Sequence, residues 1–298
     1  MVAADDGALL ASVRGPGSNS HGPGGADASA AVIAELVERA EAPTPVDAAV
    51  FYLCGADMPG DVADLQRALG RFDLAQQSLV DNDTFALLRA GTDAADALAV
   101  VCGAGINCVG RASGGRTARY PGLGWETGDW GGGDTLGREA LFLAARAEDG
   151  RGEPTALVEV VRSHFALATA VEVGEAFHYR RIPMARIGEL APGVVDAAEA
   201  GDAVARSLVE RLADEIGLLV ARAFRDLHID AADVVLGGGV LRRGEGLLHD
   251  EVVRRLPSGA RPVVLREAPV LGAALAALDL AGAAEEAKQR LRRELDAG

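Results

Sequence analysis

The sequence predicts an α/β protein built from two similar lobes. Apolar segments of strand length alternate with amphipathic segments of helix length along the 298 residues. The same series of elements occurs twice, and the second copy has one strand more than the first. Short runs of glycine or aspartate follow several of the predicted strands. Since ligands of open α/β sheets collect at the carboxyl ends of strands, we expect a binding cleft between the two lobes.

The first copy of the series opens with two short strands, Met1–Ala4 and Ala8–Arg14. The turn Asp5-Asp6-Gly7 joins them as a hairpin. A loop rich in Gly, Pro, Ser and Asn follows at Gly15–Gly25. The remaining elements are helix Ala28–Ala42, strand Ala48–Leu53, helix Asp61–Leu69, strand Ser78–Val80 and helix Thr84–Arg89. This order predicts a first lobe at residues 1–90.

The second copy begins with three strands and continues with alternating helices and strands. The strands Ala97–Cys102, Asn107–Ala112 and Arg116–Tyr120 precede a glycine-rich stretch, Pro121–Gly133. The elements after it are helices Thr135–Glu148, Thr155–Phe165 and Ala203–Leu227, strand Asp233–Leu236, helix Gly246–Leu256, strand Pro262–Leu265 and helix Val270–Leu280. We therefore expect a second lobe at residues 91–282. A charged amphipathic helix within 283–298 is expected to pack back on the first lobe.

Composition limits the partners of this protein. Hydrophobic residues make up 49% and charged residues 24%, as in a globular protein. The net charge of −15 argues against nucleic acid or anionic membranes as partners, because both would be repelled. Three cysteines without framework spacing fit a reduced compartment. With neither a transmembrane stretch nor a signal peptide in the sequence, a soluble cytoplasmic protein is expected.

Two glycine-rich turns are candidate binding loops. Cys102–Asn107 joins two predicted strands, and the triplet Gly237–Gly239 follows the apolar strand Asp233–Leu236. Glycines lack Cβ and let backbone amides approach an anion or a flat ring. The first turn could cradle a phosphate and the second could contact an adenine, or both could be plain turns. Neither fits the lysine-containing phosphate loop GxxxxGK[ST].

Acidic residues follow the predicted strand Ser78–Val80, in the run Asp81-Asn82-Asp83. A carboxylate at a strand end in a cleft can act as general base toward an alcohol. The alternative is that Asp83 caps the helix Thr84–Arg89. One residue can serve both purposes.

The stretch Gly128–Asp134 combines two acids and Trp130 with four glycines. An apolar ring face beside carboxylates suits a polyhydroxylated ligand such as a sugar. The alternative is a helix-entry loop in which Asp134 is the N-cap. The five histidines show no metal-ligand spacing, so no metal-binding residue is predicted. We interpret the cysteines as small apolar residues, at positions Cys54, Cys102 and Cys108.

Taken together, these segments resemble the BadF/BadG/BcrA/BcrD ATPase family, and within it the N-acetylglucosamine kinases. The residues that carry the resemblance are Gly17-Ser18-Asn19, Asp81-Asn82-Asp83, Gly103-Ala104-Gly105-Ile106-Asn107, Gly128–Gly133, Leu236–Gly239 and Pro269–Ala273. The resemblance runs from about residue 1 to about residue 280. It implies the actin-like ATPase fold, in which two ribonuclease-H-like lobes close on MgATP around a cleft.

The resemblance also implies roles for single residues. Asp83 matches the catalytic base, which takes a proton from the sugar hydroxyl. The positions that match sugar-binding residues are Asn19, Asn107 and Asp129. Those that match the second phosphate loop are Gly103, Ala104 and Gly105, and those that match the adenosine loop are Gly237, Gly238 and Gly239. Ala104 stands where the family often has Thr, so one hydroxyl contact to phosphate is missing.

The larger departure lies at the start of the chain. The family pattern opens with a strand and an Asp-Gly-Gly loop that holds the ATP phosphates and Mg²⁺, whereas Met1–Ala4 aligns after that loop. We therefore expect the first lobe to lack its first strand and the true start to lie upstream. An open interior edge leaves backbone groups without partners and invites aggregation. A monodisperse chain that starts at Met1 and binds MgATP would contradict this hypothesis.

The resemblance implies ATP-dependent phosphorylation of an amino sugar, N-acetylglucosamine, to its 6-phosphate. ATP and Mg²⁺ are the expected cofactors, and a homodimer is the assembly that the resemblance suggests. Two alternatives stay open. One is an ATPase activator of a 2-hydroxyacyl-CoA dehydratase, which would carry an iron–sulfur cluster. The other is a non-catalytic sensor of sugar or nucleotide, which the change at Ala104 and the missing first phosphate loop favour.

Overall fold

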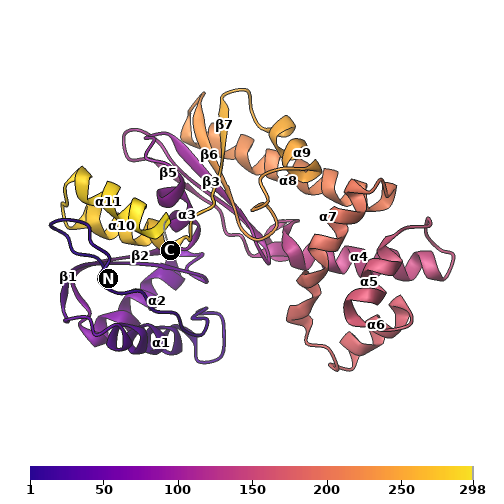
Figure 1. Cartoon of the computed structure of the whole chain (residues 1–298), viewed down its shortest axis with the longest axis horizontal. Coiled ribbons are helices and arrows are strands. Elements are labelled where there is room, and N and C mark those ends of the chain that lie inside the picture. The colour runs from indigo at the N-terminus through magenta and orange to yellow at the C-terminus, as the bar shows by residue number, and fades with distance from the viewer. Residues whose placement is uncertain (297–298) are drawn as a thin grey trace. The chain divides into compact units, whose positions relative to one another are not determined.

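The computed structural model describes residues 1–296 and divides into two compact units. Unit 1 comprises Met1–Ala94 together with the segment from Leu265 to the C-terminal end, and unit 2 comprises Ala95–Val264. Each unit is a mixed α/β structure, as the sequence predicts (Figure 1). Among the described residues, no helix is long and apolar enough to cross a membrane.

Unit 1 contains a small parallel sheet. Strand β1 (Val46–Leu53) pairs with β2 (Ala75–Asn82) in the register Val50↔Leu79. Its helices are α1 (Gly25–Arg39), α2 (Pro59–Leu69), η1 (Gly70–Phe72), α3 (Thr84–Gly91), α10 (Val270–Leu280) and α11 (Glu285–Asp296). Buried side chains of α1, α2 and both strands form a core that includes Ala30, Leu65 and Val80. This core holds the carboxyl ends of β1 and β2 in place.

The predicted N-terminal hairpin forms no sheet strand. Val2 and Leu9 make a single antiparallel bridge around Gly7, which has a φ of 77°. Within residues 1–296, β2 is the strand that pairs with β1. An apolar groove of about 660 Å³ lies beside β1, between the N-terminal segment Met1–Ala4, α1 and α10. The predicted antiparallel pairing across the turn is therefore present, but it is limited to one bridge and its hydrogen bonds and does not extend into two strands.

Helix α10 belongs to unit 1, although the sequence-based boundary at residue 282 places it in the second lobe. It packs on α3 at Gly272, where a Cβ would stand 1.9 Å from the carbonyl oxygen of Ala86. A glycine is therefore needed for this close approach of two helices.

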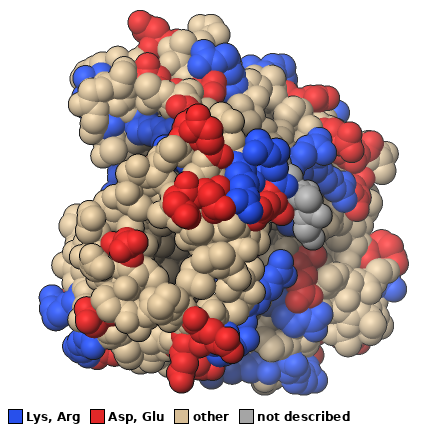
Figure 2. Space-filling view, turned by 60° about the vertical axis from the view of Figure 1, so that its left-hand side comes forward, with Lys and Arg blue, Asp and Glu red and all other residues tan. Residues whose placement is uncertain are grey.

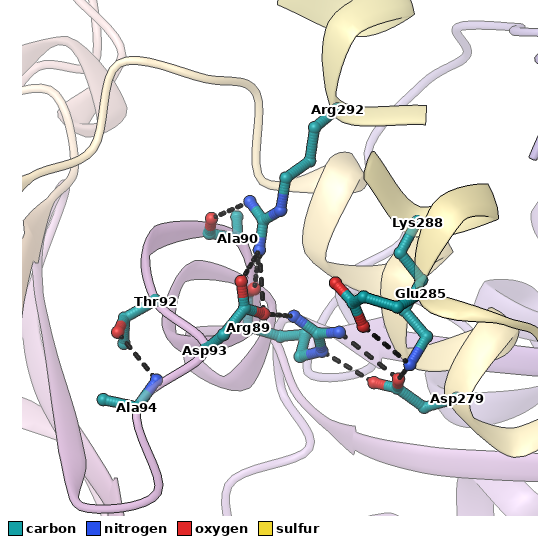
Figure 3. A network of polar contacts seen from close by, with 9 residues as sticks. All are labelled: Arg89, Ala90, Thr92, Asp93, Ala94, Asp279, Glu285, Lys288 and Arg292. Carbon is teal, nitrogen blue, oxygen red and sulfur yellow. Dashed lines mark hydrogen bonds and ion pairs between the residues drawn. The ribbon is translucent and has the colours of Figure 1, made fainter. Parts of the chain in front are cut away.

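The C-terminal helix α11 is joined to α3 and α10 by the polar network of Figure 3. The Asp279 carboxylate on α10 binds Arg89 Nε at 2.7 Å and Lys288 Nζ at 2.7 Å. Arg292 donates to the carbonyl oxygen of Ala90 at 2.7 Å and to Asp93 at 3.1 Å. These contacts fix α11 within unit 1.

Unit 2 is built on a five-stranded sheet with the order β5-β4-β3-β6-β7. Its strands are β3 (Ala97–Cys102), β4 (Ile106–Arg111), β5 (Thr117–Arg119), β6 (Ala232–Gly237) and β7 (Ala260–Val264). β3 runs antiparallel to β4, with Val100 opposite Cys108, and parallel to β6, with Val100 opposite Leu236. The carboxyl ends of β3 and β6 therefore lie side by side.

Helices of unit 2 bury a large apolar core. They are η2 (Gly124–Thr127), α4 (Gly132–Glu148), α5 (Leu157–Phe165), α6 (Ala170–His178), η3 (Met184–Leu190), α7 (Ala191–Glu199), α8 (Ala203–Leu227) and α9 (Leu247–Arg255). Residues Leu212, Ile216 and Val220 of α8 are fully buried in this core. The sequence analysis missed α6 and α7, because Pro183, Pro192 and several glycines interrupt the apolar period there.

Charged side chains of both signs lie next to one another on the surface. Figure 2 shows Asp and Glu interspersed with Lys and Arg on the displayed face, with broad uncharged areas between them. Ion pairs form between oppositely charged side chains of unit 2, such as Arg206 with Glu210 at 2.8 Å. Exposed pairs of this kind contribute little to stability.

Candidate functional site

The predicted site residues fall into two groups, one in each unit. In unit 1, Asp83 stands where β2 ends and α3 begins, and its backbone N–H donates to Leu53 O at 3.2 Å. The N–H of Thr84 donates to Asn82 Oδ1 at 2.9 Å, and the Asp83 side chain makes no capping hydrogen bond. Asn82 thus bonds the first residue of the helix, and Thr84 also interacts with the Asp83 carboxylate.

The surroundings of Asp83 make its carboxyl group a weaker acid than an exposed aspartate. Burial raises the pKa of the Asp83 carboxyl above its ordinary value. Burial also raises the pKa of Asp57, and the nearby charge of Asp83 adds to that shift, although His21 opposes it. A carboxyl with a raised pKa in this setting is suited to general base catalysis near neutral pH.

The loop that contains Asn19 packs against the segment that follows β1. Asn19 Oδ1 accepts from the N–H of His21 at 2.9 Å, and Ser20 Oγ donates to Gly55 O at 2.9 Å. Gly55 has a φ of 85°, and a Cβ there would stand 2.6 Å from Asn19 Oδ1. A side chain at position 55 would therefore displace Asn19, the residue that is predicted to bind the sugar.

Sequence reasoning missed Asp57 and His21 as parts of this group. Asn82 Nδ2 donates to Asp57 Oδ1 at 2.8 Å, and His21 Nε2 lies 3.5 Å from Asp57 Oδ2. The signal that could have found Asp57 is its place four residues after the predicted strand Ala48–Leu53. His21 offered no comparable signal, because only the fold brings it to Asp57.

The surroundings of the three cysteines disfavour their thiolate forms. Burial raises the pKa of Cys54 to about 11, with smaller contributions from the charges of Asp83 and Asp57. Burial raises the pKa of both Cys102 and Cys108 to about 12. Thiolates are the reactive form, and here they are disfavoured. Within the described residues, no group of three His, Cys, Asp or Glu side chains could hold a metal ion.

In unit 2, the turn Gly103–Gly105 joins β3 to β4 and packs against the start of α4. The N–H of Gly133 donates to Gly103 O at 2.7 Å, and the N–H of Asp134 donates to Ala104 O at 3.0 Å. Gly132 has a φ of 85°, and a Cβ there would stand 2.3 Å from Ala104 O. The predicted phosphate loop is therefore held rigidly by the first residues of α4.

The glycine triplet after β6 packs against the end of β3. Gly238 has a φ of 91°, and a Cβ there would stand 2.4 Å from Cys102 O. The N–H of Val240 donates to the same carbonyl oxygen at 3.0 Å. The structure thus brings Gly237–Gly239 next to Gly103–Gly105, two segments that are far apart in the sequence.

A cavity of about 400 Å³ opens beside these two loops. Gly103 and Ala104 line it after β3, and Gly239, Val240 and Arg243 line it after β6. The opposite wall comes from η3 and α7, where Ala191, Pro192 and Val195 supply apolar surface. An apolar slot beside glycine-rich turns at adjacent strand ends can hold a flat heterocycle with its attached phosphates. Sequence reasoning missed the α7 wall and Arg243.

The remaining predicted sugar ligands also lie in unit 2. Asn107 Oδ1 accepts from the N–H of Cys108 at 2.7 Å, and its amide lies against Gly122. Asp129 accepts a hydrogen bond from Thr127 Oγ1. Trp130 is buried, and the Arg211 guanidinium covers its ring at 4.1 Å from the centroid. The idea that Trp130 offers a ring face to a sugar was therefore wrong, because the ring packs in the core.

An α/β chain with two glycine loops at adjacent parallel strand ends and an apolar slot beside them has the architecture of a nucleotide-binding protein. Comparison with known families makes the assignment specific. The chain belongs to the BadF/BadG/BcrA/BcrD ATPase family, whose model matches residues 2–277.

Two curated relatives are similar to this chain over about 200 residues. It is 30% identical to an N-acetylmuramic acid/N-acetylglucosamine kinase of Clostridium acetobutylicum over 202 residues, which cover 66% of this chain and 65% of the relative. It is 25% identical to an N-acetyl-D-glucosamine kinase of Dictyostelium discoideum over 208 residues, which cover 67% of this chain and 65% of the relative. The aligned part thus spans slightly less than two thirds of both relatives.

Solved structures show the same fold. A protein of Porphyromonas gingivalis assigned as an N-acetylglucosamine kinase superposes with a TM-score of 0.62 at 21% identity, over 85% of this chain and 84% of that one. A protein of Chromobacterium violaceum with the same assignment gives 0.60 at 21% identity, over 84% and 83%. The actin-like sugar kinase fold predicted from the sequence is thereby confirmed.

Proposed function

We propose that this protein transfers the γ-phosphoryl group of ATP to a hydroxyl of an amino sugar. N-acetylglucosamine is the proposed substrate and its 6-phosphate the product. Membership of an ATPase family and the names of both curated relatives support this function. The observation that carries it is the place of the Asp83 carboxyl, which stands at the carboxyl end of β2 and makes no capping hydrogen bond to α3.

The cavity of unit 2 is the proposed nucleotide site. The base would lie against Ala191, Pro192 and Val195, and the phosphates would approach the amides of Gly103–Gly105. When bound, Mg²⁺ would neutralise charge on the phosphates.

The sugar would be bound and activated by the predicted polar residues. Asn19, Asn107 and Asp129 would hydrogen-bond its hydroxyl and acetamido groups. Asp83 would accept the proton of the attacking hydroxyl while the oxygen forms its bond to the γ-phosphorus and ADP leaves. Phosphoryl transfer requires mainly positioning and charge neutralisation, so one base and rigid loops are sufficient protein groups.

The competing function is a sensor that binds its ligands without turnover. Ala104 supports this alternative, because it offers no hydroxyl to a phosphate where the family often has Thr. The two functions differ in one observable, the sugar-dependent formation of ADP.

The test is ADP release from MgATP, with and without N-acetylglucosamine, for the wild type and for Asp83→Asn. We expect sugar-dependent release that the substitution abolishes, and NMR of the product should locate phosphate at the 6-position. Asp47→Asn is the matched control, since Asp47 is exposed on β1. Sugar binding without ADP release by the wild type would contradict the kinase and support the sensor.

Two finer features belong to the same proposal. A cytoplasmic location would supply ATP and keep Cys54, Cys102 and Cys108 reduced, and all three are free thiols here. A homodimer is the proposed assembly. Analytical ultracentrifugation of the purified chain would distinguish a dimer from a monomer.

A further inference from the structure

The Asp134 carboxylate lies in the unit 2 cavity beside the predicted phosphate loop. Asp134 is the third residue of α4, its N–H donates to Ala104 O at 3.0 Å, and it lines the cavity. Within residues 1–296 its carboxylate makes no hydrogen bond and no ion pair. Arg138, one turn further along α4, acts on it only through its charge. The helix start does not use this carboxylate either, because α4 has no side-chain capping bond.

The wall opposite Asp134 is shaped around this carboxylate. At Gly188, a Cβ would stand 2.6 Å from Asp134 Oδ1. Any larger residue at position 188 would push the carboxylate out of its place. Asp134 is partly buried, and this burial raises the pKa of its carboxyl above the ordinary value. Its unused acceptor oxygens line the cavity, where a ligand could supply the donors.

The other charged groups of the cavity already have partners. Glu189 accepts from Arg186 Nη2 at 2.8 Å and lies 2.8 Å from His164 Nε2. Arg243 donates to Asp196 at 2.7 Å. Asp134 is therefore the charged group of this cavity whose hydrogen-bonding capacity is still unused among the described residues.

The charge of Asp134 and the lining of the cavity indicate which part of a nucleotide it meets. A carboxylate repels phosphates, and the apolar end of the slot at Pro192 and Val195 suits the base. The sugar ring of a nucleotide connects these two parts. Its hydroxyls are the uncharged donors that occur between base and phosphates.

We propose that Asp134 binds the ribose by accepting hydrogen bonds from its 2′ and 3′ hydroxyls, and so selects ribonucleotides over deoxyribonucleotides. This inference rests on the proposed function, because it assumes that the cavity holds a nucleotide. It concerns binding alone and requires no phosphoryl transfer.

The experiment is calorimetric titration of the intact chain with MgATP, Mg-2′-deoxyATP and Mg-3′-deoxyATP. We expect the wild type to bind MgATP at least about tenfold more tightly than the weaker of the two deoxynucleotides. In Asp134→Ala this ratio should fall to about one, because the variant has no carboxylate to bind the ribose hydroxyl, so a nucleotide without that hydroxyl loses no hydrogen bond. Asp134→Asn keeps one acceptor oxygen and should give an intermediate ratio.

The control variant is Asp149→Ala, at the other end of α4, where Asp149 pairs with Arg151 on the surface. It should keep the wild-type ratio, and circular dichroism should show every variant folded. Equal binding of all three nucleotides by the wild type would overturn the inference and leave the nucleotide site intact. An unchanged ratio in Asp134→Ala, with affinity lost only when Mg²⁺ is present, would overturn it in favour of a cation contact. If the wild type binds no nucleotide, the proposed function fails as well.

Discussion

Two aspartates of unit 1 show how neighbours decide what a carboxyl group does. Asp279 lies between Arg89 and Lys288 (Figure 3). Burial alone would raise the pKa of Asp279, but its hydrogen bonds to Arg89 and Lys288 lower it below the ordinary value. Asp83 has no such cations, and burial raises its pKa. The lowered pKa of Asp279 means that its ionised form stabilises the fold, whereas the raised pKa of Asp83, the proposed base, means that its ionised form costs stability.

Asp83→Asn should give the largest effect and should separate activity from stability. Loss of the base should lower sugar-dependent ADP release about 10²- to 10⁴-fold. Stability at pH 7 should not fall, because the substitution removes a partly buried charge that folding disfavours. Steady-state kinetics would check the predicted loss of activity, and urea unfolding would check the predicted stability. A less stable variant would show that Asp83 has a structural function.

The pH dependence of the wild-type activity should show whether the pKa of Asp83 is raised, in contrast to that of Asp279. A base must be deprotonated to accept a proton, so activity should fall as the pH drops through the raised pKa of Asp83. The acid limb of kcat/KM should therefore lie above the ordinary range of an aspartate. A limb at pH 3.9 or below, the value of an exposed aspartate, would contradict the assignment.

Arg89→Met tests Asp279, the paired carboxylate of the comparison. Removal of the guanidinium leaves Asp279 and Asp93 without their shared partner, and we expect a loss of about 1–2 kcal/mol in the free energy of unfolding at pH 7. The folded-state pKa of Asp279 is lowered, so its contribution is present above its unfolded pKa and disappears as the pH falls. The difference between variant and wild type should therefore shrink in acid. A difference that does not depend on pH would assign the effect to packing of the Arg89 stem.

The exposed pair of Arg67 and Asp64 on α2 should mark the lower limit of such effects. Its two side chains are 66% and 61% exposed, at a distance of 2.8 Å. Arg67→Ala should change the unfolding free energy by no more than about 0.5 kcal/mol. Chemical denaturation beside Arg89→Met would measure this directly. An equal loss in both variants would remove the distinction between partly buried and exposed pairs.

The sequence analysis succeeded where the local pattern is long and regular. The bounds predicted for Ala203–Leu227 and Val270–Leu280 agree with α8 and α10, because both helices bury a continuous apolar stripe. Local patterns predict poorly where contacts with distant segments determine the structure. Residues 8–14 have a strand-like composition but form no strand, and the ring of Trp130 is buried under Arg211 instead of facing a ligand. The sequence analysis also left open whether the Asp83 side chain caps α3, and the structure shows no such capping bond.

Local sequence patterns are sufficient to predict the α/β class, the glycine turns and the acid at the end of a strand. These depend on short-range rules, namely apolar period, the dihedral freedom of glycine and the order of elements. Only the tertiary structure decided which distant residues meet. It placed His21 beside Asp57, the Gly237–Gly239 loop beside Cys102, and Asp134 in a cavity walled by a helix that the pattern did not reveal. Such contacts depend on packing between segments distant in the sequence, which no local pattern encodes.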